Sequence, residues 1–228
     1  MCLTIREGLS QCQTLRMIEN LLVEKNIAML SQSIDGHKLQ NIKGGFRNAE
    51  ELFPEIKRLV CSDMMLGVAS EYLLGKPNFV RVIVFDKTPT NNWLVAWHQD
   101  KTVAVSEKIE IDGWGPWSIK GGTWHAQPPL EFLDDTIAIR LHLDETTISN
   151  GCLRVIPGSH KLGLLATKEV SHHVSSLTPV DVEARIGDAL VMRPHLVHSS
   201  SKSEYPSNRR VIHVEYSGYQ LPDELSWA

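Results

Sequence analysis

Two histidines and one aspartate of this chain have the residue types and the spacing of a mononuclear metal site. His98 and Asp100 are two residues apart in the segment Trp97-His98-Gln99-Asp100, and alternate residues of a β-strand point to the same side. If the segment is extended, both side chains can reach one ion, and a distant histidine such as His198 would complete the set. Two histidines and one carboxylate bind Fe(II) on one face and leave the opposite face open for further ligands. The spacing therefore predicts an Fe(II) site at these three residues.

The same histidine–aspartate spacing occurs a second time, so it does not select the site by itself. His142 and Asp144 repeat the pattern, and the sequence contains 10 histidines. What separates a metal site from a chance match is the set of partners that the fold brings to it.

An arginine downstream of His198 points to a 2-oxo acid as a further ligand of the metal. Residues 194–200 and 209–216 are predicted to form two antiparallel strands of a hairpin, which would place His198 opposite Arg209. Directly opposed residues lie roughly 4.5–5.5 Å apart, so both side chains could line one pocket. A guanidinium binds a carboxylate bidentately, so Arg209 would hold the far carboxylate of an acid whose keto end binds iron. Arg210 is expected to face the other way, because a shift of one residue changes the face of the strand.

Four parts of the chain also resemble a known family. They are residues 97–100, residues 144–153, residues 155–161, and the pair of His198 and Arg209 with 10 residues between them. Together they are similar to the phytanoyl-CoA dioxygenase family of Fe(II)/2-oxoglutarate-dependent oxygenases, and the resemblance extends from about Val80 to Tyr216. In that family the metal-binding pair is the first of the two histidine–aspartate matches, which corresponds to His98 and Asp100.

The resemblance implies an enzyme that uses Fe(II), 2-oxoglutarate as cosubstrate and O₂, and that hydroxylates its substrate with release of succinate and CO₂. In halogenating relatives a small residue replaces the carboxylate ligand, so the presence of Asp100 favours hydroxylation. Desaturation, ring closure and epimerisation stay open. The resemblance assigns the catalytic metal ligands to His98, Asp100 and His198, and the binding of 2-oxoglutarate to Arg209, Lys87, Gln99 and Ser200.

Three other functional classes are weighed against this one: a cupin-type metal isomerase, a non-catalytic metal-binding protein of the same fold, and an oxygenase acting on a protein or nucleic acid. The position of Arg209 disfavours the first, and the intact set of ligands disfavours the second. The net charge of −4 argues against nucleic acid, which is usually bound by a basic patch. No basic cluster suited to the phosphates of coenzyme A is apparent. We expect a small natural product, amino acid or free acid as substrate rather than an acyl-CoA.

Length and composition predict one soluble domain. The chain has 228 residues, of which 42% are hydrophobic and 22% charged, which is typical of a globular protein with a sizeable core. Its 4 cysteines are scattered, as is usual for reduced thiols. The first residues lack the apolar stretch of a secretion signal, and no stretch approaches 18 apolar residues. We therefore expect a cytoplasmic protein with neither a membrane nor a nucleic acid as partner.

Helices are expected in the N-terminal part and strands in the rest. Apolar residues at helical spacing predict helices over 9–30 and 48–74, the second interrupted near Pro54. Many short strands then argue for a mainly β double-stranded β-helix (a cupin-like jelly roll), with the helical part at about 1–77 and the core at about 78–220. The candidate strands are 79–85, 93–98, 101–106, 135–143, 152–156, 188–193, 195–200 and 209–217.

The substrate pocket is expected between the Trp-rich segment 113–127 and the strand that carries Arg140. Glycines interrupt the segment, and aromatic residues line many pockets, although they are as often part of a core. A charge such as Arg140 in an apolar strand is costly unless it is paired, so its partner is either an internal carboxylate (Glu215 or Asp144) or an anionic substrate. We assign substrate contact to Arg140, Trp114, Trp117, Trp124 and His125.

Overall fold

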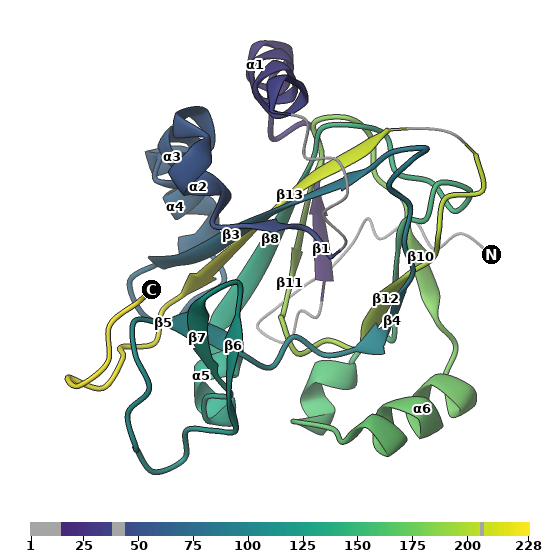
Figure 1. Cartoon of the computed structure of the whole chain (residues 1–228). Helices are drawn as coiled ribbons and strands as arrows, with labels where there is room; N and C mark the ends of the chain where they lie inside the picture. The colour runs from purple at the N-terminus through teal and green to yellow at the C-terminus, as the bar shows by residue number, and fades with distance from the viewer. Residues whose placement is uncertain (1–14, 38–43, 206–207) are drawn as a thin grey trace.

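The computed structural model describes residues 15–37, 44–205 and 208–228. Within them, a larger and a smaller antiparallel sheet face each other across the site described below (Figure 1). The larger sheet has the strand order β1 (Leu15–Ile18), β11 (Ala189–Met192), β8 (Thr136–His142), β13 (Arg209–Ser217), β3 (Asn78–Lys87) and β2 (Phe46–Arg47). The smaller sheet has the order β10 (Val180–Val182), β9 (Leu153–Val155), β12 (His198–Ser200) and β4 (Val95–His98).

Helices and a third small sheet flank these two layers. The third sheet has the order β5 (Val103–Val105), β7 (Thr123–Ala126) and β6 (Trp117–Lys120). Ahead of β3 in sequence come α1 (Glu24–Gly36), α2 (Ala49–Leu52), α3 (Pro54–Val60) and α4 (Asp63–Ser70). Later in the chain come α5 (Leu130–Asp134), the 3₁₀ helix η1 (Ser159–Leu162) and α6 (Thr167–Ser176).

The alternation of side chains along β13 explains how the larger sheet serves both a core and a cavity. Ile212, Val214 and Tyr216 pack into the main hydrophobic cluster, which also holds buried residues of α1, α3 and α4. The residues between them, His213 and Glu215, point to the opposite face because the side-chain period of a strand is two. The helices thus seal one face of the sheet, and the polar face is turned toward the smaller sheet.

The N-terminal elements differ from the predicted helix over 9–30. Residues 15–18 form β1 on the edge of the larger sheet, the helix α1 begins only at Glu24, and residues 9–14 lie outside the described part of the chain. Leu15 and Ile18 have a spacing compatible with a helix. They instead contact two different hydrophobic clusters, on the two sides of an edge strand. Tertiary pairing with β11 therefore overrides the local pattern.

The second predicted helical stretch and the candidate strands from residue 79 onward correspond to elements of the structure, whereas β6, β7, β10, α5, η1 and α6 were not predicted. The helical stretch over 48–74 forms α2, α3 and α4, with Pro54 at the first turn of α3, where its missing N–H costs nothing. Each candidate strand from residue 79 onward overlaps a strand of the structure. The facing antiparallel sheets agree with the predicted jelly roll.

Candidate metal centre

Two neighbouring strands of the smaller sheet bring His98, Asp100 and His198 together. β4 and β12 pair antiparallel, and His98 lies directly opposite His198, with 4.3 Å between the ring centroids. Asp100 follows β4, and its backbone N–H donates to the Pro194 carbonyl over 3.0 Å. Its two carboxylate oxygens lie 3.5 Å from His98 Nε2 and 3.6 Å from His198 Nε2. One ligand atom from each residue lies within 4.8 Å of the other two, so a single ion can bind all three.

The hydrogen bonds of both histidines leave the correct nitrogen free for a metal. His98 Nδ1 is 2.8 Å from the Ala96 carbonyl oxygen, and His198 Nδ1 is 2.7 Å from that of Leu196. A carbonyl can only accept, so in each ring Nδ1 carries the hydrogen and donates. The lone pair is then on Nε2, the atom that faces Asp100, and a hydrogen bond of this kind also fixes the orientation of a metal-binding ring. The donor set therefore fits Fe(II).

The charge states of two of these groups are also those of metal ligands. Burial lowers the pKa of His198 to about 4 despite the attraction of Asp100, so its imidazole is neutral near pH 7. Burial alone would raise the pKa of Asp100, but the adjacent imidazole of His98, followed by those of His198 and His213, holds it well below its usual range. A neutral imidazole and an ionised carboxylate bind metal ions without first losing a proton.

The second histidine–aspartate pair is engaged elsewhere. His142 Nδ1 lies 2.9 Å from the Thr146 hydroxyl, and burial lowers the pKa of His142 to about 3. Asp144 accepts hydrogen bonds of 2.7 and 2.8 Å from the guanidinium of Arg210. Among the described residues, these two side chains belong to none of the groups that could hold an ion.

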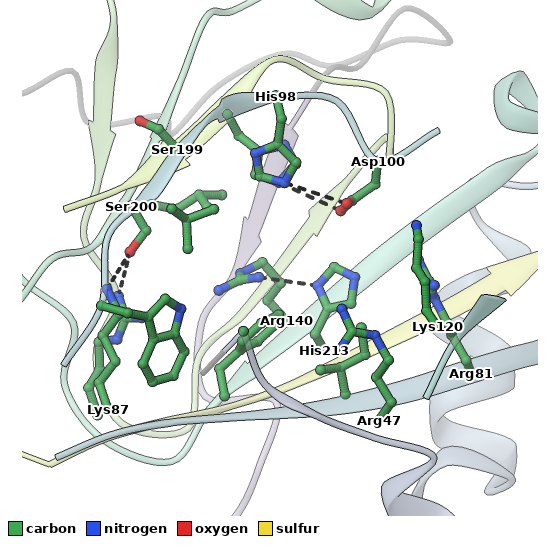
Figure 2. Close-up of a pocket in the computed structure, with 18 of the residues that line it drawn as sticks. Arg47, Arg81, Lys87, His98, Asp100, Lys120, Arg140, Ser199, Ser200 and His213 are labelled. Atoms are coloured by element: carbon green, nitrogen blue, oxygen red, sulfur yellow. Dashed lines mark hydrogen bonds and ion pairs between the residues drawn. The ribbon is translucent and has the colours of Figure 1, made fainter. Parts of the chain in front are cut away.

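A cavity of about 250 Å³ opens beside the candidate metal ligands, between the two sheets (Figure 2). Ligand pockets for drug-sized molecules are commonly about 300–1,000 Å³, so this one suits small ligands. Six cationic side chains line it, against one carboxylate, that of Asp100. The six are Arg47, Arg81, Lys87, Lys120, Arg140 and Arg209.

Lys87 and Arg209 form a cationic group at one end of the cavity. They lie directly opposite each other on β3 and β13. Lys87 Nζ donates to the Ser200 hydroxyl over 3.0 Å and to the Ser201 carbonyl over 2.6 Å. Arg209 Nη1 donates to the Gly151 carbonyl and, over 3.3 Å, to the same Ser200 hydroxyl. Neither cation has a carboxylate partner among the residues that the structure describes.

The electrostatics of this group favour an anion. Burial, followed by repulsion from Arg209 and Arg140, lowers the pKa of Lys87 to about 7. Burial also lowers the pKa of Arg209 to about 10. Within the described structure, Trp93 Nε1, Arg140 Nε and Arg209 Nε are buried donors without a hydrogen-bond partner. Donors of this kind are costly unless an acceptor meets them, and an anion rich in oxygen such as 2-oxoglutarate supplies acceptors. The residues at this end therefore fit that cosubstrate.

The predicted hairpin between residues 194–200 and 209–216 is wrong, although His198 and Arg209 do line one pocket as it implied. β12 pairs with β4 and β9 in the smaller sheet, whereas β13 pairs with β3 and β8 in the larger one. The two segments meet across the cavity, because the sheets face each other, and not as neighbours in one ladder. His198 and Arg209 consequently line the same space. Arg210 faces away, as predicted, and binds Asp144 and Asp35.

A row of charged and polar groups crosses the floor of the cavity. Glu215 accepts from Arg81 Nη2 over 2.7 Å, and His213 Nε2 lies 3.3 Å from the same oxygen. On the other side of the ring, Arg140 Nη1 lies 3.2 Å from His213 Nδ1. Because Arg140 can only donate, His213 Nδ1 accepts and its Nε2–H donates to Glu215. Arg140 pairs with neither of the two carboxylates expected from the sequence. Glu215 binds Arg81, and Asp144 binds Arg210.

Gln99 is not positioned to bind the cosubstrate. Its buried amide donates to the carbonyls of Gly163 and His195 over 2.8 and 2.7 Å, and accepts from the Leu165 backbone N–H over 2.8 Å. Gln99 stands between two residues that face the metal, so the alternation of an extended chain turns it to the other side. Its side chain anchors the loop after η1 to β4.

The aromatic residues expected at the substrate do not line the cavity. Trp114 is buried in a cluster with Phe132 and Leu225, and Trp117 and Trp124 pack against that cluster. His125 is buried, with Nδ1 donating to the Thr123 carbonyl over 3.0 Å. The three tryptophans therefore belong to a core under the third sheet, whereas the register of β6 and β7 places His125 on the opposite face, the one that carries Lys120. From the same segment it is Lys120 that reaches the cavity.

Sequence reasoning missed several lining residues. Arg81 and His213 are charged or polar positions in otherwise apolar strands, the same signal that identified Arg140. Arg47 and Lys120 carried no such signal, because exposed cations are ordinary on a protein surface.

Comparisons with known proteins agree with the site. The model of the phytanoyl-CoA dioxygenase family (PhyH) matches residues 31–211. L-proline trans-4-hydroxylase of Streptomyces griseoviridis is 27% identical over 186 residues, covering 70% of this chain and 62% of that protein. Phytanoyl-CoA dioxygenase 1 of Oryza sativa subsp. japonica is 34% identical over 172 residues, covering 71% of this chain and 52% of that protein. The chain thus spans about half to three-fifths of the length of these two relatives.

A solved structure shares the fold. The crystal structure of AviO1 from Streptomyces viridochromogenes Tue57 superimposes with a TM-score of 0.67 at 21% identity, covering 92% of this chain and 91% of that chain. The mainly β jelly-roll fold is confirmed by this likeness. Among the described residues, none of the helices is both long and apolar enough to cross a membrane.

Proposed function

The chain belongs to the phytanoyl-CoA dioxygenase family, and we propose that it is an Fe(II)- and 2-oxoglutarate-dependent dioxygenase that hydroxylates a small molecule. In the overall reaction one oxygen atom of O₂ enters the substrate and the other enters succinate, while 2-oxoglutarate loses CO₂. One observation carries the proposal. A set of two imidazoles and a carboxylate lies in the same cavity as the Lys87 and Arg209 cations, which lack a carboxylate partner in the described structure.

The ligand set supports the role of Fe(II). His98 Nε2, His198 Nε2 and Asp100 would hold the ion, and bound Fe(II) supplies the coordination and activation of O₂ that no protein side chain can provide. The three residues would hold the ion from one side only, because β4 and β12 are adjacent strands. Ala96 and Leu196 keep both rings in the orientation for binding through their carbonyls.

The cationic end of the cavity supports 2-oxoglutarate as the cosubstrate. Arg209 and Lys87 would bind the far carboxylate, with the Ser200 hydroxyl between them as a shared hydrogen-bond partner. The planar guanidinium is pre-organised for a carboxylate, so the arginine side chain loses little conformational entropy when it binds one. This anion site also disfavours a cupin-type isomerase and a non-catalytic metal-binding protein, neither of which needs two buried cations beside the ligands.

Arg140 supports a substrate with polar or anionic character. Its guanidinium lies over the ring of Phe85, 5.3 Å from the centroid, and donates to His213, which fixes its position at the centre of the cavity. Burial, followed by repulsion from Arg209, lowers its pKa to about 9, so it stays charged at neutral pH. The small volume of the cavity, about 250 Å³, and the likeness to a proline hydroxylase favour an amino acid or another small acid.

Binding under anaerobic conditions tests the proposal before any substrate is known. Fe(II) is titrated into the purified chain with and without 2-oxoglutarate, and bound iron and the absorption of the ternary complex are followed. We expect one Fe(II) per chain and an absorption band that requires 2-oxoglutarate. The variants His98→Ala and His198→Ala should lose both signals, whereas His172→Ala, an exposed histidine on α6, should retain them. Full iron binding by the first two variants would refute the assignment.

A further inference from the structure

A second cationic group lies on the Asp100 side of the cavity, away from Lys87 and Arg209. It consists of Arg47, Arg81 and Lys120, all of which line the cavity. Figure 2 shows the three side chains gathered next to one another beneath Asp100, with Arg140 and His213 between them and Lys87. The function proposed above uses only the other end of the cavity.

Three separate elements deliver these side chains. Arg47 ends the short edge strand β2, with Phe46 turned to the core and Arg47 to the cavity. Lys120 is the last residue of β6, before the glycine turn to β7, and its Nζ donates to the Thr102 hydroxyl over 2.8 Å. Arg81 lies on β3 opposite Glu215. Three separate elements therefore bring cationic side chains to the same place. The alternation of side chains along a single strand would not produce this arrangement.

Only one of the three cations is neutralised within the described residues. Arg81 forms a buried ion pair with Glu215, with an N–O distance of 2.7 Å. Neither Arg47 nor Lys120 makes an ion pair with a described residue. Burial and then repulsion from Arg81 lower the pKa of Arg47, and burial, Arg81 and Arg47 lower that of Lys120; the attraction of Asp100 opposes both shifts without cancelling them. Like charges gathered in this way repel one another, and a bound anion would relieve the repulsion.

The two cationic groups are too far apart to share one molecule of 2-oxoglutarate. Arg81 and Lys87 are six residues apart on β3, and Ile83 and Phe85 between them also line the cavity. At about 3.3 Å per residue their Cα atoms are roughly 20 Å apart. A five-carbon chain with C–C bonds of about 1.5 Å spans only about 5–6 Å. An acid bound at Lys87 and Arg209 therefore leaves Arg47 and Lys120 without an ion-pair partner among the described residues.

We propose that Arg47 and Lys120, supported by the Arg81–Glu215 pair, form a second anion subsite that binds a carboxylate or phosphate group of the primary substrate. This inference rests on the proposed function, because it takes the other end of the cavity to hold 2-oxoglutarate. The bound anionic group fixes one end of the substrate next to Asp100, so the distance from that group to the metal selects the carbon that is hydroxylated. The subsite thus restricts the substrates to small acids or phosphate esters.

Anion binding to the anaerobic complex of the full chain with Fe(II) and saturating 2-oxoglutarate tests this subsite. Acetate and inorganic phosphate are titrated separately by calorimetry at low ionic strength, where surface charges are least screened. The tighter of the two probes identifies the group. Contacts of partly exposed charges are modest, so we expect the dissociation constant to rise about fivefold in Arg47→Gln or Lys120→Gln and at least about tenfold in the double variant.

Two matched variants control for the loss of net charge. Arg185→Gln and Lys108→Gln remove exposed cations outside the cavity and should leave the dissociation constants within about twofold, and Arg47→Lys should retain most of the binding. Equal binding by the double variant and the wild type would overturn the inference, as would the absence of binding of both probes to the wild type. Formation of the complex is observed first, so a failure of the proposed function is recognised separately. The dissociation constants of the same variants are then compared in the absence of iron.

Discussion

His98 and His198 are direct neighbours across β4 and β12, and each donates its Nδ1–H to the carbonyl two residues before it. The pairing of two short strands therefore sets the separation of the rings and the direction of both Nε2 atoms. Asp100 completes the set because its backbone is held by Pro194, just before β12. The site is thus built by the ladder of the smaller sheet, and the larger sheet supplies the cations that face it.

Arg209 should determine the affinity for 2-oxoglutarate, and its neighbour Arg210 should not. A charge-assisted contact is worth about 1.5–3 kcal/mol, so Arg209→Ala should raise the dissociation constant of 2-oxoglutarate roughly ten- to hundredfold. Arg210→Ala removes the contacts with Asp144 and Asp35 and should lower the melting temperature instead. Calorimetric titration and thermal unfolding of both variants separate the two effects. Equal losses of 2-oxoglutarate affinity would contradict the arrangement of β13.

The affinity for 2-oxoglutarate should fall as the pH rises through about 7. Lys87 in the free protein has a pKa of about 7, so it is protonated below this pH and neutral above it, and only the protonated form attracts the dianion. Titrations between about pH 6 and pH 8 measure the dependence. Lys87→Gln should bind 2-oxoglutarate more weakly at low pH and show a flatter profile. A profile that is unchanged in this variant would assign the pH dependence to another group.

Asp100→Gly should abolish hydroxylation. The change removes one of the three proposed ligands and its negative charge. Even residues that only support a ligand account for about 10–100-fold in metal affinity or activity, so we expect a loss of at least about a hundredfold. Bound iron and 2-oxoglutarate-dependent turnover are measured together. Normal hydroxylation by this variant would mean that the carboxylate is not a required ligand.

Arg140→Ala should reduce coupled turnover more than substrate-independent consumption of 2-oxoglutarate. The side chain lies at the centre of the cavity and contacts none of the three metal ligands through a hydrogen bond of the described structure, so its loss should spare the iron site. Succinate release is compared with and without an acid that the wild type hydroxylates. If both rates fell by the same factor, Arg140 would have to support the metal or the cosubstrate instead.

Local patterns in the sequence identified three residues that the structure brings together at the candidate metal centre, but not the pairing of strands. The spacing of His98 and Asp100 fixes their common side once the segment is extended, and the same alternation would have excluded Gln99. Which strand lies beside β12 depends on contacts far apart in sequence, so the hairpin to Arg209 was wrong although both residues reach the cavity. Residue type alone also could not separate Trp114, which packs into a core, from Trp93, which lines the cavity.

A crystal structure of the anaerobic complex with Fe(II) and 2-oxoglutarate, with the iron located by anomalous scattering, tests the whole arrangement. The anomalous peak should lie between His98 Nε2, Asp100 and His198 Nε2, and the far carboxylate of 2-oxoglutarate should contact Arg209 and Lys87. A peak at His142 and Asp144 would contradict the assignment of the metal centre. So would a peak at Asp100, His213 and Glu215, whose ligand atoms also lie within 4.8 Å of one another.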